Sequence, residues 1–129
     1  MQTFTGISFE QSTIRKDDVT DGCSQTLMLG EKYLAPNDYG TGLPLSENEN
    51  LYVGMDNDVC RTTSGPPKQD RWGDEVNAAW LFGSAHPNAA NFILCDGAAI
   101  SVNYAVDANT FLMLGIRSGR TTPADMSKL

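Results

Sequence analysis

The sequence predicts an α+β domain dominated by strands, with an antiparallel sheet, a C-terminal Asp-Gly hairpin and short helices. The strongest observation is that two apolar segments, residues 91–95 and 98–104, flank the dipeptide Asp96-Gly97, because Asp-Gly between apolar runs is a frequent hairpin turn. A second short apolar run, at residues 26–31, is typical of a buried strand. A helix pattern with a cap and a stop occurs over one short segment, so strands are expected to outnumber helices.

The N-terminal part of the chain is expected to contribute an extended segment and a turn before the buried strand. Residues 4–14 place isoleucine and phenylalanine among Thr, Ser and Gln, which favours a half-buried strand or an extended approach to one. The dipeptide Asp21-Gly22 then provides turn residues before the apolar run. These features predict two extended segments separated by a turn.

Two surface loops are predicted in the middle of the chain. Residues 35–50, which include Ser46, are rich in Pro, Asn, Asp and Gly and have no sustained apolar period. Residues 64–67 contain two successive prolines, which oppose a helix, and they separate the segment around Leu51 from the C-terminal half. Loops as long as the first one usually serve a function or face a partner.

The hairpin is expected to lie at the centre of the core. With a two-residue type I′ turn, Ile93 lies opposite Ile100 on one face, and Phe92 lies opposite Ser101 on the other. Both faces are then partly apolar. We therefore expect the hairpin to belong to a sheet that is covered on at least one side and shielded on the other.

A short helix is predicted after the hairpin. Asp107 is a suitable N-cap, residues 108–114 follow it, and Gly115 stands at the left-handed stop position. With 129 residues, of which 40% are hydrophobic, the chain can form one compact domain over residues 1–129.

The charge and the apolar pattern exclude several classes of protein. The chain has 9 Lys and Arg against 16 Asp and Glu, a formal net charge of -7. The basic pair Arg15-Lys16 runs straight into Asp17-Asp18, so no basic stripe for nucleic acid forms. The longest apolar run, residues 78–82, is far shorter than the roughly 20 residues that cross a membrane. We therefore expect neither a nucleic-acid partner nor a membrane-spanning segment in this sequence.

The three cysteines, Cys23, Cys60 and Cys95, do not form a C-x-x-C pair. Neither a zinc ribbon nor a thioredoxin-type motif is therefore predicted. One disulfide with one free thiol fits this odd number, and so do three reduced, mostly buried thiols. The sequence leaves the pairing open.

Catalysis is not expected. His86 is the single histidine, so a triad or a histidine metal site would depend on it alone. An extended segment over residues 91–95 places His86 up to roughly 20 Å from Asp96, so we expect His86 to order the loop before the hairpin through hydrogen bonds. The chain has no G-x-S-x-G, P-loop or dinucleotide-binding motif. An enzyme hypothesis would therefore rest on His86, Ser84 and Cys95.

A binding module for calcium or carbohydrate is the alternative to a structural protein. Asp56-Asn57-Asp58 provides three consecutive oxygen-bearing side chains, although the spacing is not that of an EF-hand loop. Calcium is therefore a candidate ligand of Asp56 and Asp58, and no other cofactor is expected. The aromatic side chains that could stack on a sugar, or equally belong to the core or an interface, are Trp72, Trp80, Tyr33, Tyr39 and Tyr52.

Residues 82–97 resemble the H-x9-DG domain of bacterial prepilin-type proteins, because a histidine is followed by nine residues and then Asp-Gly. Residues 20–32 are similar to the family's Thr-Asp-Gly-Thr-Ser-Asn-Thr, apolar strand and Gly-Glu pattern, with Cys23 in place of the usual Thr. Between them, residues 56–58 and Arg61 are similar to an acidic stretch and an arginine of the family. The residues that match the two main motifs are His86, Asn91, Asp96, Gly97, Asp21, Gly22, Gly30 and Glu31.

The resemblance implies a pilin-like head without its N-terminal helix. Members of the family begin with a leader cut by a prepilin peptidase and an apolar helix that anchors them in the inner membrane. This sequence shows neither, so we interpret it as the C-terminal head of a longer, membrane-anchored precursor. The implied function is that of a non-catalytic structural subunit, pilin-like or pseudopilin-like, in a type II secretion-like or pilus-like assembly.

The same resemblance implies where the protein acts and with what. Its expected partners are other pilin-like subunits or the secretion machinery. Its expected location is extracytoplasmic, in the periplasm or at the cell surface, and it would contact the membrane only through the missing helix.

Overall fold

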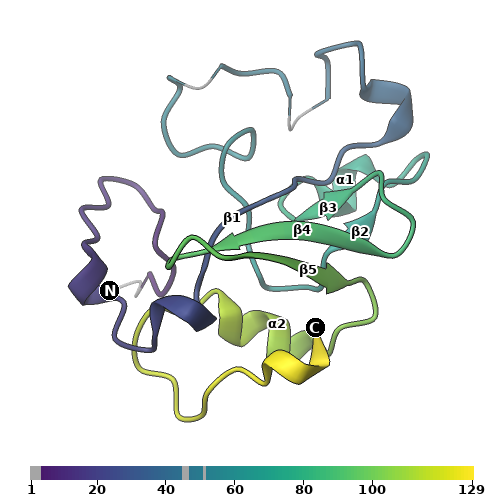
Figure 1. Cartoon of the computed structure of the whole chain (residues 1–129). Helices are drawn as coiled ribbons and strands as arrows, with labels where there is room; N and C mark the ends of the chain where they lie inside the picture. The colour runs from purple at the N-terminus through teal and green to yellow at the C-terminus, as the bar shows by residue number, and fades with distance from the viewer. Residues whose placement is uncertain (1–3, 45–46, 51) are drawn as a thin grey trace.

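A three-stranded antiparallel sheet in the order β1–β4–β5 forms the centre of the molecule (Figure 1). The computed structural model describes residues 4–44, 47–50 and 52–129, without the side chains of residues 75 and 77. The strands of the sheet are β1 (Leu27–Gly30), β4 (Ala89–Leu94) and β5 (Ala99–Asn103). The predicted strand-dominated α+β class, with an antiparallel sheet and an Asp-Gly hairpin, is confirmed.

The turn between β4 and β5 contains three residues, where two were predicted. The N–H of Leu94 donates to the carbonyl of Ala98 over 2.9 Å, and the N–H of Gly97 donates to the carbonyl of Leu94 over 2.9 Å. Cys95, Asp96 and Gly97 therefore form the loop, and Gly97 supplies its positive φ of 90°. This is a type I turn followed by a left-handed residue, a form that Asp-Gly suits as well as the predicted type I′ turn.

The register of the hairpin consequently differs by one residue from the predicted one. Phe92 lies opposite Ile100 and not Ser101, and Ile93 lies opposite Ala99 and not Ile100. Because successive side chains alternate between the two faces of a sheet, this shift collects the large apolar residues of both strands on one face.

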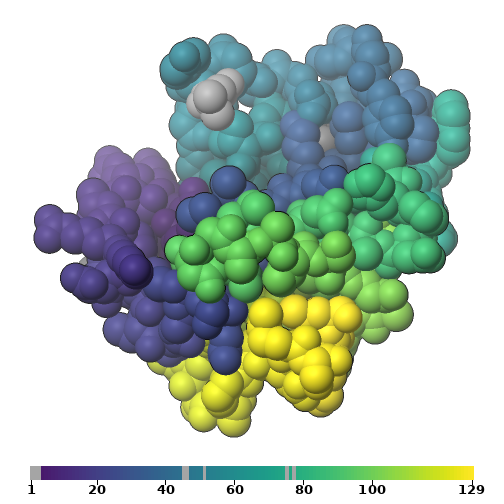
Figure 2. All heavy atoms as spheres, viewed as in Figure 1, coloured from purple at the N-terminus to yellow at the C-terminus, as the bar shows by residue number. Residues whose placement is uncertain are grey.

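Helix α2 (Ala108–Leu114) and the C-terminal segment cover that apolar face. In Figure 1 the helix lies beneath the sheet, and Figure 2 shows the C-terminal segment packed against the hairpin. The ring of Phe92 meets the rings of Phe82 and Phe111 edge-on, with centroids 5.2 and 5.6 Å away. The other buried residues of this core are Leu27, Ala90, Leu94, Val102, Val106, Leu114 and Ala124.

The predicted boundaries of α2 are confirmed, but the role of the residue that follows it is not. Asp107 caps the helix, because its Oδ1 accepts hydrogen bonds from the backbone N–H of Thr110 over 2.9 Å and from the Thr110 hydroxyl over 3.1 Å. Gly115 has a φ of -81° and is not in the left-handed region. A β-carbon at Gly115 would instead overlap the side chain of Thr63. Glycine is needed there for a close approach of two segments.

The predicted strand at residues 4–14 does not form. The segment is irregular, and the ring of Phe4 stacks on that of Phe9 with centroids 5.0 Å apart. The backbone N–H of Arg117 donates to the carbonyl of Thr5 over 2.9 Å, and its side chain donates to the carbonyl of Phe4 over 2.7 Å. Arg117 thus pairs with backbone carbonyls at the start of this segment.

The long central loop is confirmed where the structure describes it. Residues 35–44 and 47–50 contain no strand, and their helical structure is the 3-10 turn Pro36–Asp38. Ser46 and Leu51 lie outside the described residues, as do residues 1–3.

A second, small sheet was not predicted. β2 (Lys68–Gln69) pairs in parallel with β3 (Gly83–Ser84), and the short helix α1 (Glu75–Ala78) lies between them in the sequence. Neither α1 nor any other helix in the described part of the chain has the length and apolar character needed to cross a membrane.

The second face of the three-stranded sheet is open, although it was expected to be shielded. On β5 the side chains of Ala99 and Ser101 are exposed. On the edge strand β1, Met28 is 41% exposed and Leu29 is 60% exposed. We refer to Met28 and Leu29 as the apolar edge of β1.

Gly30 must be a glycine because two aromatic rings crowd it. A β-carbon there would lie 2.5 Å from Cε1 of Phe92 and 2.8 Å from Cδ1 of Phe82. Gly30→Ala is therefore expected to lower the free energy of unfolding by about 1–3 kcal/mol, because a core ring must move. Urea unfolding measures this loss, with Gly40→Ala as the control because nothing lies within 4 Å of a β-carbon there. Equal losses at the two glycines would contradict the explanation.

Candidate functional site

The two motif segments found in the sequence lie side by side in the structure. The upstream motif (residues 20–32) contains β1, the downstream motif (residues 82–97) contains β4, and the two strands pair antiparallel. Beyond the strands, the N–H of Cys95 donates to the carbonyl of Thr26 over 2.8 Å, and the N–H of Asp96 donates to that of Cys23 over 3.2 Å. The motifs therefore form one structural unit.

His86 meets Glu31 of the upstream motif. The imidazole Nε2 lies 3.3 Å from Oε1 of Glu31, and the His86 side chain is 58% exposed. The other carboxylate oxygen of Glu31 accepts a hydrogen bond from the backbone N–H of Asn91 over 2.6 Å. Asn91 Oδ1 accepts from the hydroxyl of Ser101 over 2.7 Å. Glu31 thus links the histidine loop to β4.

The groups that an enzyme hypothesis requires have other partners. The hydroxyl oxygen of Ser84 accepts the backbone N–H of His86 over 3.2 Å, and the thiol of Cys95 lies 3.8 Å from the carbonyl of Leu27. Asp96, ten positions after His86, accepts the N–H of Ala98 over 2.9 Å within the hairpin turn. Among the described residues, these contacts do not assemble the three groups into a nucleophile–base pair.

Tyr104 organises the histidine loop and was not singled out from the sequence. Its hydroxyl oxygen lies 3.1 Å from the carbonyl of Ser84, 2.8 Å from that of His86 and 2.9 Å from that of Ala89. The single hydroxyl proton can be donated to one of these carbonyls at a time. Burial raises the pKa of Tyr104, so the hydroxyl remains a donor at neutral pH.

Tyr104→Phe is expected to lower the free energy of unfolding by about 0.5–1.5 kcal/mol, because a part-buried hydrogen bond is lost while the ring is kept. His86→Gln is expected to cost less, because its exposed contact with Glu31 is screened by water. Urea unfolding of both variants checks the order. A larger loss at His86 than at Tyr104 would contradict it.

Asp21 and Gly22 close the upstream motif against the C-terminal segment. The carboxylate of Asp21 accepts the backbone N–H of Gly119 over 3.1 Å and that of Arg120 over 2.9 Å. The Nε of Arg120 lies 3.2 Å from the same carboxylate, and the Arg120 side chain is 2% exposed. Arg120 also donates to the carbonyls of Asp21 and Gln25 over 2.8 and 3.1 Å. Gly22 has a φ of 102°, which favours glycine.

The candidate calcium residues Asp56 and Asp58 shape their own loop. Asp56 Oδ1 accepts the N–H of Asp58 over 3.2 Å, and Asp58 Oδ2 accepts the N–H of Glu49. In residues 4–44, 47–50 and 52–129, no three His, Cys, Asp or Glu side chains are grouped to hold a metal ion. Calcium binding stays a prediction, which thermal unfolding with calcium and with a chelator at matched ionic strength tests.

The candidate stacking aromatics differ in exposure. Tyr33 is 1% exposed and belongs to the core, so it is not a stacking residue. Tyr39 is half-exposed, and its hydroxyl donates to Asp70 Oδ2 over 2.7 Å. Burial, with a smaller effect of Asp70, raises the pKa of Tyr39 to about 12. Tyr52, Trp72 and Trp80 are exposed.

All three cysteines are free thiols. Burial is the main cause that raises the pKa of the Cys95 thiol, and Cys23 and Asp96 raise it further. Because the thiolate is the reactive form, Cys95 is expected to react with iodoacetamide at pH 7.5 several-fold more slowly than free cysteine does. Peptide mass spectrometry after timed alkylation measures the rate. A rate at or above that of free cysteine would contradict the assignment.

Comparison with known proteins gives a family match that covers both motifs and most of the chain. A family model, SBP_bac_10, described as a protein of unknown function (DUF1559), matches residues 1–109. Neither the curated proteins nor the solved structures give a match. The matched region contains β1, the β4–β5 hairpin and the start of α2. The chain belongs to the DUF1559 family.

Proposed function

We propose that this chain is the extracytoplasmic head of a pilin-like or pseudopilin-like structural subunit, of the H-x9-DG prepilin type. In this proposal it has no catalysis of its own and serves a type II secretion-like or pilus-like assembly. Residues 1–129 form one head domain, and the precursor carries an N-terminal helix that anchors it in the inner membrane.

The observation that carries the proposal is that the motif residues are used to hold the fold together. Asp21 fixes the C-terminal segment, Gly30 makes room for two rings, and Glu31 joins His86 to Asn91. In a catalytic or ligand site, we would expect such residues to converge on one cavity. Their dispersed structural roles favour a scaffold protein.

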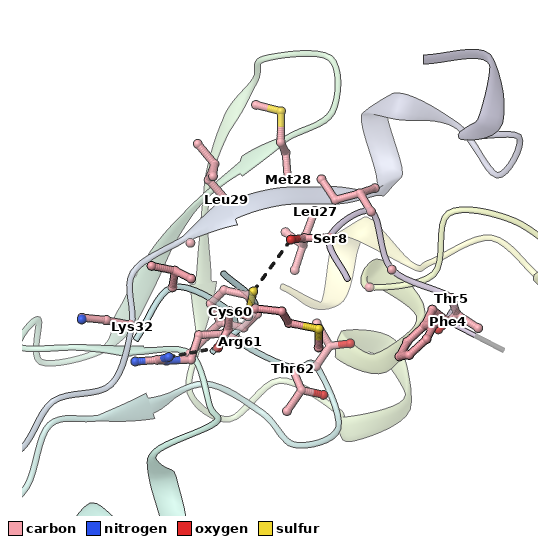
Figure 3. Close-up of a pocket in the computed structure, with 18 of the residues that line it drawn as sticks. Phe4, Thr5, Ser8, Leu27, Met28, Leu29, Lys32, Cys60, Arg61 and Thr62 are labelled. Carbon is pink, nitrogen blue, oxygen red and sulfur yellow. Dashed lines mark hydrogen bonds between the residues drawn. The ribbon is translucent and has the colours of Figure 1, made fainter. Parts of the chain in front are cut away.

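The apolar edge of β1 supplies a surface for a neighbouring subunit. Met28 and Leu29 are adjacent on an edge strand and are 41% and 60% exposed. Figure 3 shows their side chains pointing away from Cys60 and Arg61. Exposed apolar side chains on a strand edge are suited to contact with another protein. The proposed partners are other pilin-like subunits or the secretion machinery.

Site-specific photocrosslinking tests this proposal. A photoreactive residue is placed at Leu29 in the full precursor, expressed in the source cells. We expect crosslinks to pilin-like or secretion proteins in the envelope fraction. The matched control is Leu112, an exposed leucine (40%) on α2. The proposal would be contradicted if neither Leu29 nor the control Leu112 gave crosslinks and the protein were found as a monomer in the cytoplasm.

A further inference from the structure

Two of the three cysteines lie next to each other where the two motif segments meet. Cys23 begins the 3-10 turn Cys23–Gln25, and Cys95 is the first residue of the hairpin loop. The N–H of Cys95 donates to the carbonyl of Thr26 over 2.8 Å, and the next N–H, that of Asp96, donates to the carbonyl of Cys23 over 3.2 Å. Two consecutive peptide groups of the loop are thus bound to one turn of the upstream segment.

These hydrogen bonds hold the two backbones at a separation that a disulfide can bridge. Main chains joined side by side by N–H···O=C bonds lie about 5 Å apart, and the Cα atoms of most disulfides are roughly 4.4–6.8 Å apart. The bonded oxygen is two covalent bonds from the Cα of Cys23, and the bonded nitrogen of Asp96 is two covalent bonds from the Cα of Cys95. The 3.2 Å hydrogen bond therefore fixes the approach of the two cysteines.

The two side chains also affect each other. Cys95 Sγ lies 3.8 Å from the carbonyl of Leu27, in the same upstream segment. Burial is the main cause that raises the pKa of the Cys95 thiol, and Cys23 is the next, ahead of the adjacent Asp96. Electrostatic effects weaken with distance, so the two sulfur atoms are close. Both cysteines are half-buried, which leaves them within reach of a dissolved reagent.

The third cysteine lies elsewhere. Cys60 lines a cavity between β1 and the N-terminal segment, with its Sγ 3.8 Å from the hydroxyl oxygen of Ser8 (Figure 3). Neither Cys23 nor Cys95 is among the described residues that line this cavity. The structure thus separates the thiols into a pair and a single one, a choice that the odd number of cysteines leaves open.

We propose that Cys23 and Cys95 form a disulfide bond that joins the two motif segments, and that Cys60 stays a thiol. The oxidant is an exchangeable disulfide, carried by a small molecule or a protein. One cysteine thiolate attacks the donor disulfide and releases the first donor thiolate, and the second cysteine then displaces the other donor sulfur from the mixed disulfide. The cysteines lose two electrons and two protons, and the donor becomes two thiols.

In the cell, this proposal rests on the extracytoplasmic location proposed above, because disulfides persist in oxidising compartments and are rare in the cytosol. The pairing itself is a property of the chain, so it is measured on the purified protein. A bond between positions 23 and 95 closes a loop of about 70 residues, and such a cross-link stabilises mainly by restricting the unfolded chain. Oxidation is therefore expected to raise the Tm by about 5–15 °C.

Oxidation of the purified 129-residue chain tests the pairing. The reduced protein is incubated with excess oxidised glutathione, remaining thiols are blocked with iodoacetamide, and tryptic peptides are mapped by mass spectrometry without reduction. Trypsin cleaves after Lys32 and Arg61, which places the three cysteines on different peptides. We expect one peptide pair joined through Cys23 and Cys95, with Cys60 alkylated. Thermal unfolding with and without dithiothreitol measures the change in Tm.

Three variants link the change to the residues. Cys23→Ser and Cys95→Ser are each expected to abolish both the cross-link and the rise in Tm on oxidation. Each variant is compared with its own reduced form, so that the effect of the substitution on the fold does not enter. Cys60→Ser is the matched control and should keep the cross-link and the full rise. If Cys95→Ser does not fold, Cys23→Ser, in the turn before β1, provides the same test.

The outcomes separate the pairing from the proposed function. A cross-link that contains Cys60, three alkylated thiols after oxidation, or an equal Tm of the cross-linked and reduced chains would overturn the inference and leave the subunit role untouched. Alkylation of the protein in the source cells, before and after reduction, then examines the compartment. We expect Cys23 and Cys95 to be alkylated only after reduction. Reduced thiols there, with a cross-link in the purified chain, would contradict the extracytoplasmic location and not the pairing.

Discussion

Phe92→Ala is expected to lower the free energy of unfolding by about 3–5 kcal/mol, because it removes the central ring of the core. Phe92 is 1% exposed and contacts the rings of Phe82 and Phe111 edge-on. The loss includes the transfer of a large apolar side chain and the cavity left between two rings that come from distant segments. Urea unfolding followed by far-UV circular dichroism measures it.

The matched control for this substitution is Trp72→Ala, because Trp72 is a large aromatic residue that is 75% exposed. It is expected to change stability by less than about 0.5 kcal/mol. If Phe92→Ala does not fold, Phe92→Leu keeps most of the apolar volume and is expected to unfold cooperatively at a lower urea concentration. Similar effects of Phe92→Ala and Trp72→Ala would contradict the packing described here.

Arg120→Met is expected to lower the free energy of unfolding by about 3–5 kcal/mol, because it leaves Asp21 without its buried counter-charge. The Arg120 side chain is 2% exposed, and that of Asp21 is 13% exposed. The substitution also removes the donors to the carbonyls of Asp21 and Gln25. Chemical denaturation of the variant measures the loss.

A double-mutant cycle with Asp21→Asn separates the ion pair from the other contacts of Arg120. We expect the double variant to be less destabilised than the sum of the two single variants, because the uncompensated charge disappears. Arg15→Met, at an exposed arginine, should have little effect. Additive single effects, or a loss at Arg120 below about 1 kcal/mol, would contradict the role of the pair.

The elements predicted correctly from the sequence are those specified by neighbouring residues. The N-cap at Asp107 and the apolar run at residues 26–31 are local signals, and both correspond to the observed elements. The hairpin register was mispredicted because Asp96-Gly97 suits two turn types, and the choice depends on which face of β4 is buried. The strand at residues 4–14 does not form, and the carbonyl of Phe4 at its start binds Arg117, which is far away in the sequence and is a partner that no local pattern predicts.

The candidate site was likewise predictable only in part. The resemblance identified His86 and Glu31, and the pairing of β1 with β4 brings them together. Arg120 and Tyr104 were missed, because an arginine or a tyrosine in a loop has no local pattern that marks it as buried or as close to several backbone carbonyls. The approach of Cys23 to Cys95 depends on tertiary packing, which no spacing rule describes.

The contacts of Arg117 and Arg120 with the start of the chain have a consequence for the order of folding. The hydrogen bonds between Arg120 and Asp21 span 99 positions, and that between Arg117 and Phe4 spans 113. A nascent chain cannot form them until residues 117–120 have left the ribosome. Native contacts of such long range slow folding, so residues 4–21 are expected to reach their native positions late, after the arginines that bind them have been synthesised.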